Sequence, residues 1–247
     1  MLGRLFLLLL LLVSSPYALA ENECVVLLHG LGRTHHSMDE IENKLLEQGY
    51  LVWSESYQSR ELPVDFLADQ TLSLGLAYCA QQQAARVHLV SHSLGGLLIR
   101  VYLQDHSINN LGRIVMLAPP NHGSEVADAL KENSLYEWAM GPAGQVLGTG
   151  SDGIANQLDP IMGEIGIIAG NTTSDPWFSP IIPGADDGKV SVESARLDEM
   201  KAFLEVEAGH TFIMRNNMVI DQILSFLREG VFKPLPPSPD SSGYENR

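Results

Sequence analysis

The stretch HLVSHSLGG, residues 88–96, is the most informative part of this sequence. Apolar residues run up to Val90, and a second apolar run begins at Leu94. This pattern predicts a strand that ends near Val90 and a helix that begins at Leu94, with Ser93 on the turn between them.

So abrupt a change from strand to helix needs small neighbours. Ser91 and Gly95 stand two residues before and after Ser93, as the nucleophile-elbow pattern G-x-S-x-G requires, with Ser91 in place of the first glycine. The turn would hold the Ser93 hydroxyl above a sheet at a helix N-terminus, where backbone N–H groups and the helix dipole favour negative charge. The alternative is a serine that only caps the helix.

Strand-like and helix-like segments alternate along the rest of the chain. We expect strands at 24–28, 51–55, 86–90, 113–117, 165–169 and 202–206, and helices at 36–48, 64–83, 94–105 and 217–228. The alternation predicts an α/β protein with a mostly parallel central sheet and helices on both faces. Ligands of such sheets lie at the carboxyl ends of the strands, so the residues that follow each strand are the candidates for chemistry.

A serine hydroxyl becomes a good nucleophile when a base takes its proton and a third group orients that base. His210 lies in AGHTF, directly after the last predicted strand, and is the expected base. His92 is inside the elbow and is expected to point away along the turn. The other histidines considered open or end a helix, or lie in a strand or loop: His35, His36, His88, His106 and His122.

The acid is expected between Ser93 and His210 in sequence, after the strand at 165–169. Asp187 is the first choice, in the segment ADDGKVSVESARL, and Asp186 and Asp175 are the alternatives. One of the two adjacent aspartates fits an ordinary solvated turn. Two weaker candidates follow them in the chain: Glu193 and Asp198.

An oxyanion that forms on the substrate needs backbone donors that are already in place. One expected donor is the N–H of Leu94, the residue after the serine. The other is the N–H of Leu31 in LLHGLGR, where Gly30 and Gly32 allow a tight turn after the first strand. The alternative for this loop is a turn without a functional role.

Residues 121–160 interrupt the strand–helix rhythm and form either a cap over the site or a structural insertion. We expect a substrate pocket lined by Leu31, Leu94 and aromatic side chains, which could equally belong to the core. These aromatic candidates are Tyr136, Trp138, Trp177 and Phe178.

The two ends of the chain differ from its middle. Arg4, the apolar run at 5–13 and the small-residue cleavage pattern Ala18-Leu19-Ala20 predict a cleaved signal peptide at 1–20, and therefore an exported protein. The single domain would span 21–230. Residues 231–247 are rich in proline and poor in apolar side chains, so we expect a disordered tail.

Composition restricts the partners. The formal net charge of −15 argues against nucleic acid and anionic membranes, and no segment after the signal is long and apolar enough to span a bilayer. Two cysteines in an exported chain suggest a Cys24–Cys79 disulfide, with two buried thiols as the alternative. Nothing indicates a cofactor, a metal site or an oligomeric state.

Together these motifs resemble the α/β-hydrolase superfamily, and within it the bacterial lipases and esterases. The matching segments are HGLGR (29–33), SHSLGG (91–96), APPNHGS (118–124), DGKVSVESARL (187–197) and GH (209–210). The resemblance covers about residues 24 to 228 and implies the α/β-hydrolase fold. It also implies Ser93 as nucleophile, Asp187 as acid and His210 as base, with Leu31 and Leu94 at the oxyanion hole.

The resemblance further implies hydrolysis of a small-molecule or lipid carboxylic ester through an acyl-enzyme. Lipases of this kind are often larger, with an evident lid and sometimes a calcium site, and here 121–160 is the one lid candidate. A simple carboxylesterase is therefore as plausible as a lipase. The alternatives are the same triad acting on thioesters or amides or in acyl transfer, and a non-catalytic binding module of the same fold.

Overall fold

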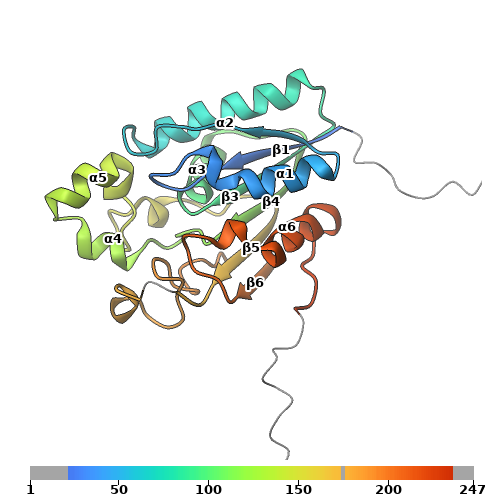
Figure 1. Ribbon diagram of the computed structural model, residues 1–247. Coiled ribbons are helices and arrows are strands. Elements are labelled where there is room, and N and C mark those ends of the chain that lie inside the picture. The colour runs from blue at the N-terminus through green and yellow to red at the C-terminus, as the bar shows by residue number, and fades with distance from the viewer. Residues whose placement is uncertain (1–21, 174–175, 236–247) are drawn as a thin grey trace, which may run out of the picture.

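A computed structural model describes residues 22–173 and 176–235 (Figure 1). The expected signal peptide at 1–20, the candidate acid Asp175 and most of the expected tail lie outside these residues. The last described residues, from Val231 on, contain no regular secondary structure.

Six strands form one sheet in which every neighbouring pair is parallel. The order across the sheet is β2-β1-β3-β4-β5-β6. The strands are β1 (Glu23–Leu28), β2 (Leu51–Ser54), β3 (Arg86–His92), β4 (Leu111–Leu117), β5 (Glu164–Gly170) and β6 (Ala202–Val206). All six were expected, but β3 continues past Val90 because Ser91 and His92 still pair with Met116 and Leu117 of β4.

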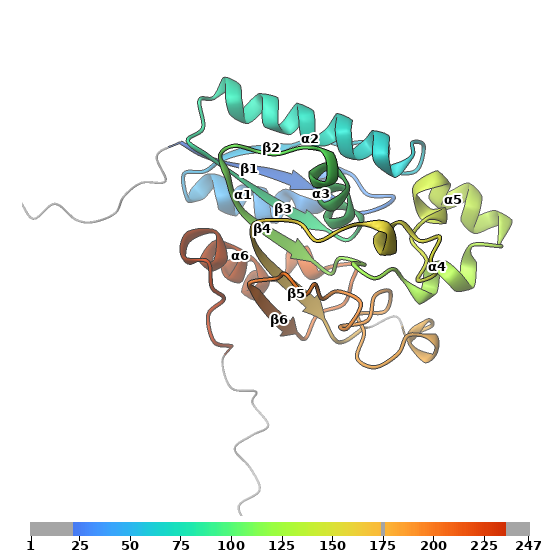
Figure 2. The same cartoon turned by 180° about the vertical axis from the view of Figure 1, so that it is seen from behind.

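Four helices cover the two faces of the sheet. Figure 1 shows α1 and α6 on the near face, and Figure 2 shows α2 and α3 on the opposite face. Their bounds are α1 (Asp39–Glu47), α2 (Val64–Gln81), α3 (Leu94–Asp105) and α6 (Asn217–Glu229). The helix expected at 36–48 begins as a separate 3₁₀ turn, η1 (His35–Met38).

Side chains of each strand alternate between two cores. Val26 and Leu28 of β1 pack with residues of α2 and α3, whereas Val25 and Leu27 pack with residues of α1 and α6. Both sets are almost fully buried because helices cover both faces of a parallel sheet. This explains why the strands read as continuous apolar runs.

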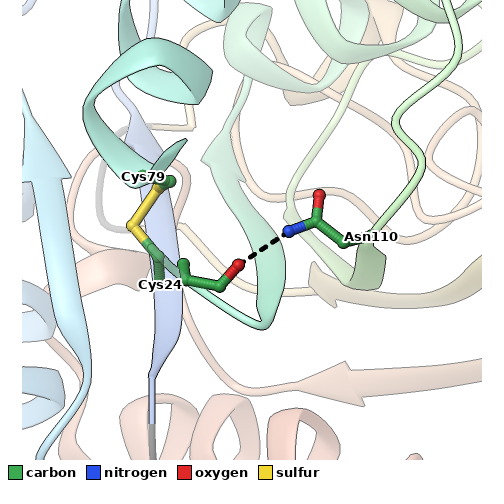
Figure 3. Close-up of a disulfide and its surroundings, with 4 residues drawn as sticks. Cys24, Cys79 and Asn110 are labelled. Carbon is green, nitrogen blue, oxygen red and sulfur yellow. Dashed lines mark hydrogen bonds between the residues drawn. A yellow bond between two sulfur atoms is a disulfide. The ribbon is translucent and has the colours of Figure 1, made fainter. Parts of the chain in front are cut away.

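A disulfide between Cys24 and Cys79 ties the start of β1 to the last turn of α2 (Figure 3). Both residues are fully buried, and the pairing expected from the sequence is confirmed. In the part of the chain that the structure describes, no helix combines the length and apolar character needed to cross a membrane.

The segment 121–160 contains two helices, α4 (Glu125–Leu130) and α5 (Ser134–Gln145), followed by a 3₁₀ turn, η2 (Ile154–Gln157). Both views show α4 and α5 beyond the edge toward which the strands run (Figures 1 and 2). Helix α5 is broken at Gly141, which has φ 63°. A Cβ at that position would lie 1.6 Å from the carbonyl oxygen of Arg60, so only glycine fits this contact.

Candidate active site

Ser93 lies on the sharp turn between β3 and α3. Its backbone has φ 52° and ψ −120°, a conformation that costs a non-glycine residue on the order of 1–3 kcal/mol. The chain comes very close to β1 here, because a Cβ at Gly95 would lie 2.8 Å from the carbonyl oxygen of Leu28. Ser91 is fully buried two residues before the turn. The expected strand–turn–helix arrangement is therefore present, with small residues where the packing is tightest.

The structure brings Ser93, His210 and Asp187 together. The Nε2 atom of His210 lies 3.0 Å from the Ser93 hydroxyl oxygen, and its Nδ1 atom lies 2.8 Å from Oδ2 of Asp187. The Asp187 carboxylate can only accept a hydrogen bond, so the hydrogen of a neutral His210 belongs on Nδ1, which donates to it. Nε2 is then free to accept the hydroxyl proton of Ser93.

The loop that carries Asp187 holds its carboxylate in one orientation. Oδ1 accepts hydrogen bonds from the backbone N–H groups of Lys189 at 3.0 Å and Val190 at 2.9 Å. Oδ2 is therefore left to accept a hydrogen bond from His210. The backbone N–H of His210 also donates to the Asp187 carbonyl oxygen at 2.9 Å. Side chain and backbone therefore fix the two residues relative to each other.

The other candidate acids are placed differently. The Asp186 carboxylate accepts hydrogen bonds from the backbone N–H of Gly188 at 2.7 Å and from the hydroxyl of Ser179 at 2.8 Å, as is typical of a turn residue. Glu193 forms an ion pair with Arg196 at 3.4 Å. Asp198 lines a separate cavity beside Arg100.

The loop after β1 lies directly against the elbow. A Cβ at Gly30 would lie 2.9 Å from Nδ1 of His92 and 3.2 Å from Cβ of Ser93, so a side chain at this position would push the loop away. Leu31, the next residue, lines the same cavity as Ser93. Leu94 is the first residue of α3, where the N–H has no acceptor within the helix. The two expected oxyanion donors thus belong to two segments that meet at Ser93: Leu31 to the loop after β1, and Leu94 to the first turn of α3.

His29 fixes the shape of this loop, a role that the sequence analysis did not assign. Its Nε2 accepts the backbone N–H of Tyr57 at 3.2 Å, so its hydrogen lies on Nδ1, which donates to the Gly30 carbonyl oxygen at 2.9 Å. The ring stacks on Tyr57 with a centroid distance of 3.8 Å. Burial lowers the pKa of His29 to about 4, so it is neutral near neutral pH.

His92 connects the elbow to the candidate base. It does not point away along the turn as expected: its Nε2–H donates to the backbone carbonyl oxygen of His210 at 3.0 Å. The two rings lie 4.9 Å apart. Burial, with smaller contributions from His210 and Arg33, holds the pKa of His92 well below its usual value. A neutral His92 therefore holds the backbone of His210 in place.

The segment APPNHGS explains how the acid loop is held. The Ser124 hydroxyl donates to the Lys189 carbonyl oxygen at 2.7 Å, and the side-chain amide of Asn121 donates to the Ala195 carbonyl oxygen at 2.8 Å. Asn121 in turn accepts a hydrogen bond at its own carbonyl oxygen from the buried Arg100 at 2.7 Å. This segment links the end of β4 to the loop that contains Asp187.

A cavity of about 330 Å³ opens at Ser93. One wall consists of apolar side chains from 121–160: Val126, Ala127, Leu130, Met140 and Leu147. Of the aromatic residues expected in the pocket, Tyr136 and Phe178 line this cavity. Trp138 and Trp177 do not line it; these two residues are 82% and 83% exposed to solvent. A second cavity of about 370 Å³ shares Phe178, Lys189 and His210 with the first.

Within the described residues, one group has the geometry to hold a metal ion: His35, His36 and Asp39, with ligand atoms within 4.8 Å of one another. It lies at η1 and the start of α1, and none of its members lines the cavity at Ser93. His36 is largely exposed and Asp39 is half-buried, and the two side chains form an ion pair of 3.3 Å when His36 is protonated.

No protein-family model matches this sequence, and no curated protein matches it by sequence similarity. Solved structures do match. The mature form of the Bacillus licheniformis lipase BlEst2 aligns with a TM-score of 0.71 and 20% identity, over 87% of this chain and 95% of that one. The metagenomic carboxyl esterase MGS0156 aligns with a TM-score of 0.62 and 15% identity, over 76% and 64%.

A third similar structure is the phospholipase PlaB from Legionella pneumophila in complex with thio-NAD. It aligns with a TM-score of 0.56 and 23% identity, over 70% of this chain and 44% of that one. Identities this low support an inference about the fold alone. Together with the parallel sheet and the elbow at Ser93, they show that this chain has the α/β-hydrolase fold.

Proposed function

We propose that this protein is a serine hydrolase that cleaves carboxylic esters. The observation that carries the proposal is the continuous hydrogen-bonded series from Ser93 through His210 to Asp187, with separations of 3.0 and 2.8 Å. The strained conformation of Ser93 supports it, because a strained residue at a cavity is a common feature of active sites. The structural similarity to a lipase and an esterase agrees with this chemistry.

In the proposed mechanism, His210 takes the hydroxyl proton of Ser93 as the serine oxygen attacks the ester carbonyl. The N–H groups of Leu31 and Leu94 stabilise the oxyanion, a contribution of about 3–4 kcal/mol for each donor. His210 then gives its proton to the leaving alcohol, and an acyl-enzyme remains on Ser93. Water, deprotonated by His210, attacks the acyl carbonyl, and the bond to Ser93 breaks as His210 returns the proton to the serine oxygen and the acid leaves. Asp187 stabilises the imidazolium in both steps.

The apolar wall from 121–160 is the proposed acyl pocket. Tyr136 and Phe178 contribute to it, and Trp138 and Trp177 remain outside. A cavity of about 330 Å³ has the size of a small-ligand site. Both esterase and lipase activity fit this wall, and we propose α4 and α5 as the cap.

We also propose that the protein is exported. The buried Cys24–Cys79 disulfide supports this, since such bonds persist in oxidising compartments. The signal-like segment at 1–20 is the second argument.

A fluorophosphonate probe tests the proposed nucleophile directly. We expect stoichiometric labelling of the folded wild type at Ser93, and labelling slower by several orders of magnitude in His210→Ala. Labelling at another serine, or equal rates in the two proteins, would contradict the proposed roles. Parallel rates on ester, thioester and amide analogues would then identify the bond that is cleaved.

A further inference from the structure

Among the residues that the structure describes, the charged side chains that line the Ser93 cavity are basic. Arg33 and Lys189 line it together with the imidazoles of His92 and His210, and no carboxylate of the described residues does. This is the reverse of the chain as a whole, which has 30 acidic and 15 basic residues. The cavity is therefore lined by two cationic side chains on an acidic protein, and the carboxylate of Asp187 lies on the side of His210 that faces away from Ser93.

Neither cation is neutralised by a carboxylate within the described ranges 22–173 and 176–235. The Arg33 side chain is half-buried and donates only to a neutral group, the carbonyl oxygen of Thr211, at 3.5 Å. Lys189 is exposed and takes part in no ion pair with another described residue. Other cations of the protein are paired, for example Arg113 and Lys201 with Glu164. The charges of Arg33 and Lys189 are thus available to a ligand.

Both cations belong to segments that hold the acid and the base. Arg33 reaches Thr211, the residue after His210, and Lys189 follows Asp187 by two positions. The apolar wall comes from a different part of the chain, α4, α5 and the residues that follow them. In ester hydrolysis His210 must protonate the departing alcohol, so the alcohol lies beside His210. The acyl chain then occupies the apolar wall.

The second cavity continues on the side of His210. Lys189, His210 and Thr211 line it, together with the polar Thr172. Two carboxylates, Asp187 and Glu207, line this second cavity and not the first. The Asp187 carboxylate is already occupied, because it accepts hydrogen bonds from His210, Lys189 and Val190. An anionic group close to the ester would face Arg33 and Lys189.

We propose that the site selects esters whose alcohol part carries an anionic group, and that Arg33 and Lys189 recognise it. This inference rests on the proposed ester hydrolysis. Phosphate and carboxylate groups both fit the chemistry, because guanidinium and ammonium groups bind either.

The test compares butyrate esters of four alcohols: 2-hydroxyethylphosphonate, 3-hydroxypropionate, the neutral 3,3-dimethylbutanol and choline. These esters are soluble and short, so their rates report the charge of the substrate and not adsorption to a lipid surface. For the wild type we expect a higher kcat/KM for at least one anionic ester than for the neutral ester, and the lowest value for choline. High salt should reduce the preference.

Arg33→Gln and Lys189→Gln should each lower the ratio of kcat/KM for the anionic ester to that for the neutral ester by roughly 3- to 5-fold. Lys44→Gln, which removes a partly exposed cation of α1 that does not line the Ser93 cavity, is the control and should leave the ratio unchanged. Lys189 is exposed, so its variant should fold even if Arg33→Gln does not.

The relative rates of the phosphonate and carboxylate esters identify the preferred anion. Hydrolysis of the neutral ester without any anionic preference, or a preference that both variants retain, overturns this inference and leaves the proposed function standing. If the wild type cleaves none of these four esters, this inference is overturned. The proposed function fails as well only if p-nitrophenyl esters of every chain length are also left uncleaved.

Discussion

Replacing Asp187 by Asn should remove most of the hydrolytic activity and leave the fold intact. Oδ1 of Asp187 accepts two backbone N–H groups, from Lys189 and Val190, so the oxygen of the new amide must stay at that position. The amide nitrogen then replaces Oδ2, which lies 2.8 Å from Nδ1 of His210. The opposite orientation would direct an NH₂ group at two N–H donors.

An NH₂ group that faces Nδ1 forces the hydrogen of His210 onto Nε2. That atom lies 3.0 Å from the Ser93 oxygen and must be unprotonated to act as the base. The corresponding change in serine proteases lowers kcat about 10⁴-fold, or roughly 5.5 kcal/mol of transition-state stabilisation. We expect a loss of the same order here, with little change in the free energy of unfolding.

The assay is kcat for a short p-nitrophenyl ester, with thermal unfolding measured in parallel. Asp186→Asn is the matched control, because Asp186 bonds to Ser179 and Gly188 instead of a histidine, and its rate should stay within about 2-fold. Asp175→Asn should behave like this control. If Asp187→Asn retained a tenth of the wild-type rate, or Asp186→Asn lost as much, the assignment of the acid would be refuted.

Three further results are expected. Gly30→Ala should lower kcat on the order of 10²-fold, since its Cβ would lie 2.9 Å from His92 and 3.2 Å from Cβ of Ser93 and would displace the loop that carries Leu31, the proposed oxyanion donor. An unchanged kcat would show that this loop takes no part in catalysis. The double variant Cys24→Ala/Cys79→Ala should lose about 4 kcal/mol of unfolding free energy in denaturant titrations, because the disulfide closes a loop with a sequence separation of 55. A loss below about 1 kcal/mol would contradict this expectation. Burial lowers the pKa of His29 to about 4, so the folded state binds fewer protons than the unfolded state between about pH 6.5 and 4. Because protonation then favours the unfolded state, the free energy of unfolding should fall by about 3 kcal/mol as the pH drops through that range. His29→Gln should flatten that part of the pH–stability curve relative to wild type, and identical slopes would refute the assignment.

The sheet and the elbow could be read from the sequence because their signals are local. Short apolar runs separated by amphipathic segments predicted every described strand, and the small residues around Ser93 predicted the sharp turn. The ends of the strands were predicted less well. Ser91 and His92 belong to β3 because they pair with β4, and no sequence pattern marks that pairing.

The supporting residues of the site could not be read in this way. His29 and His92 act through contacts with Tyr57 and with the His210 carbonyl oxygen, 28 and 118 positions away in sequence. Trp138 was expected in the pocket, but it is 82% exposed on α5, because the orientation of a helix in an insertion depends on tertiary packing. Exposure of an aromatic residue is not visible in composition.

In the proposed mechanism, Ser93 is the nucleophile of an ester hydrolase. The most direct measurement is hydrolysis of a p-nitrophenyl ester series with chains from about C2 to C16 by purified wild type and Ser93→Ala, with fold integrity checked by circular dichroism. We expect an active wild type and a variant reduced by several orders of magnitude, and the chain-length optimum would distinguish an esterase from a lipase. A folded wild type without activity on any chain length, or a variant as active as wild type, would contradict the claim.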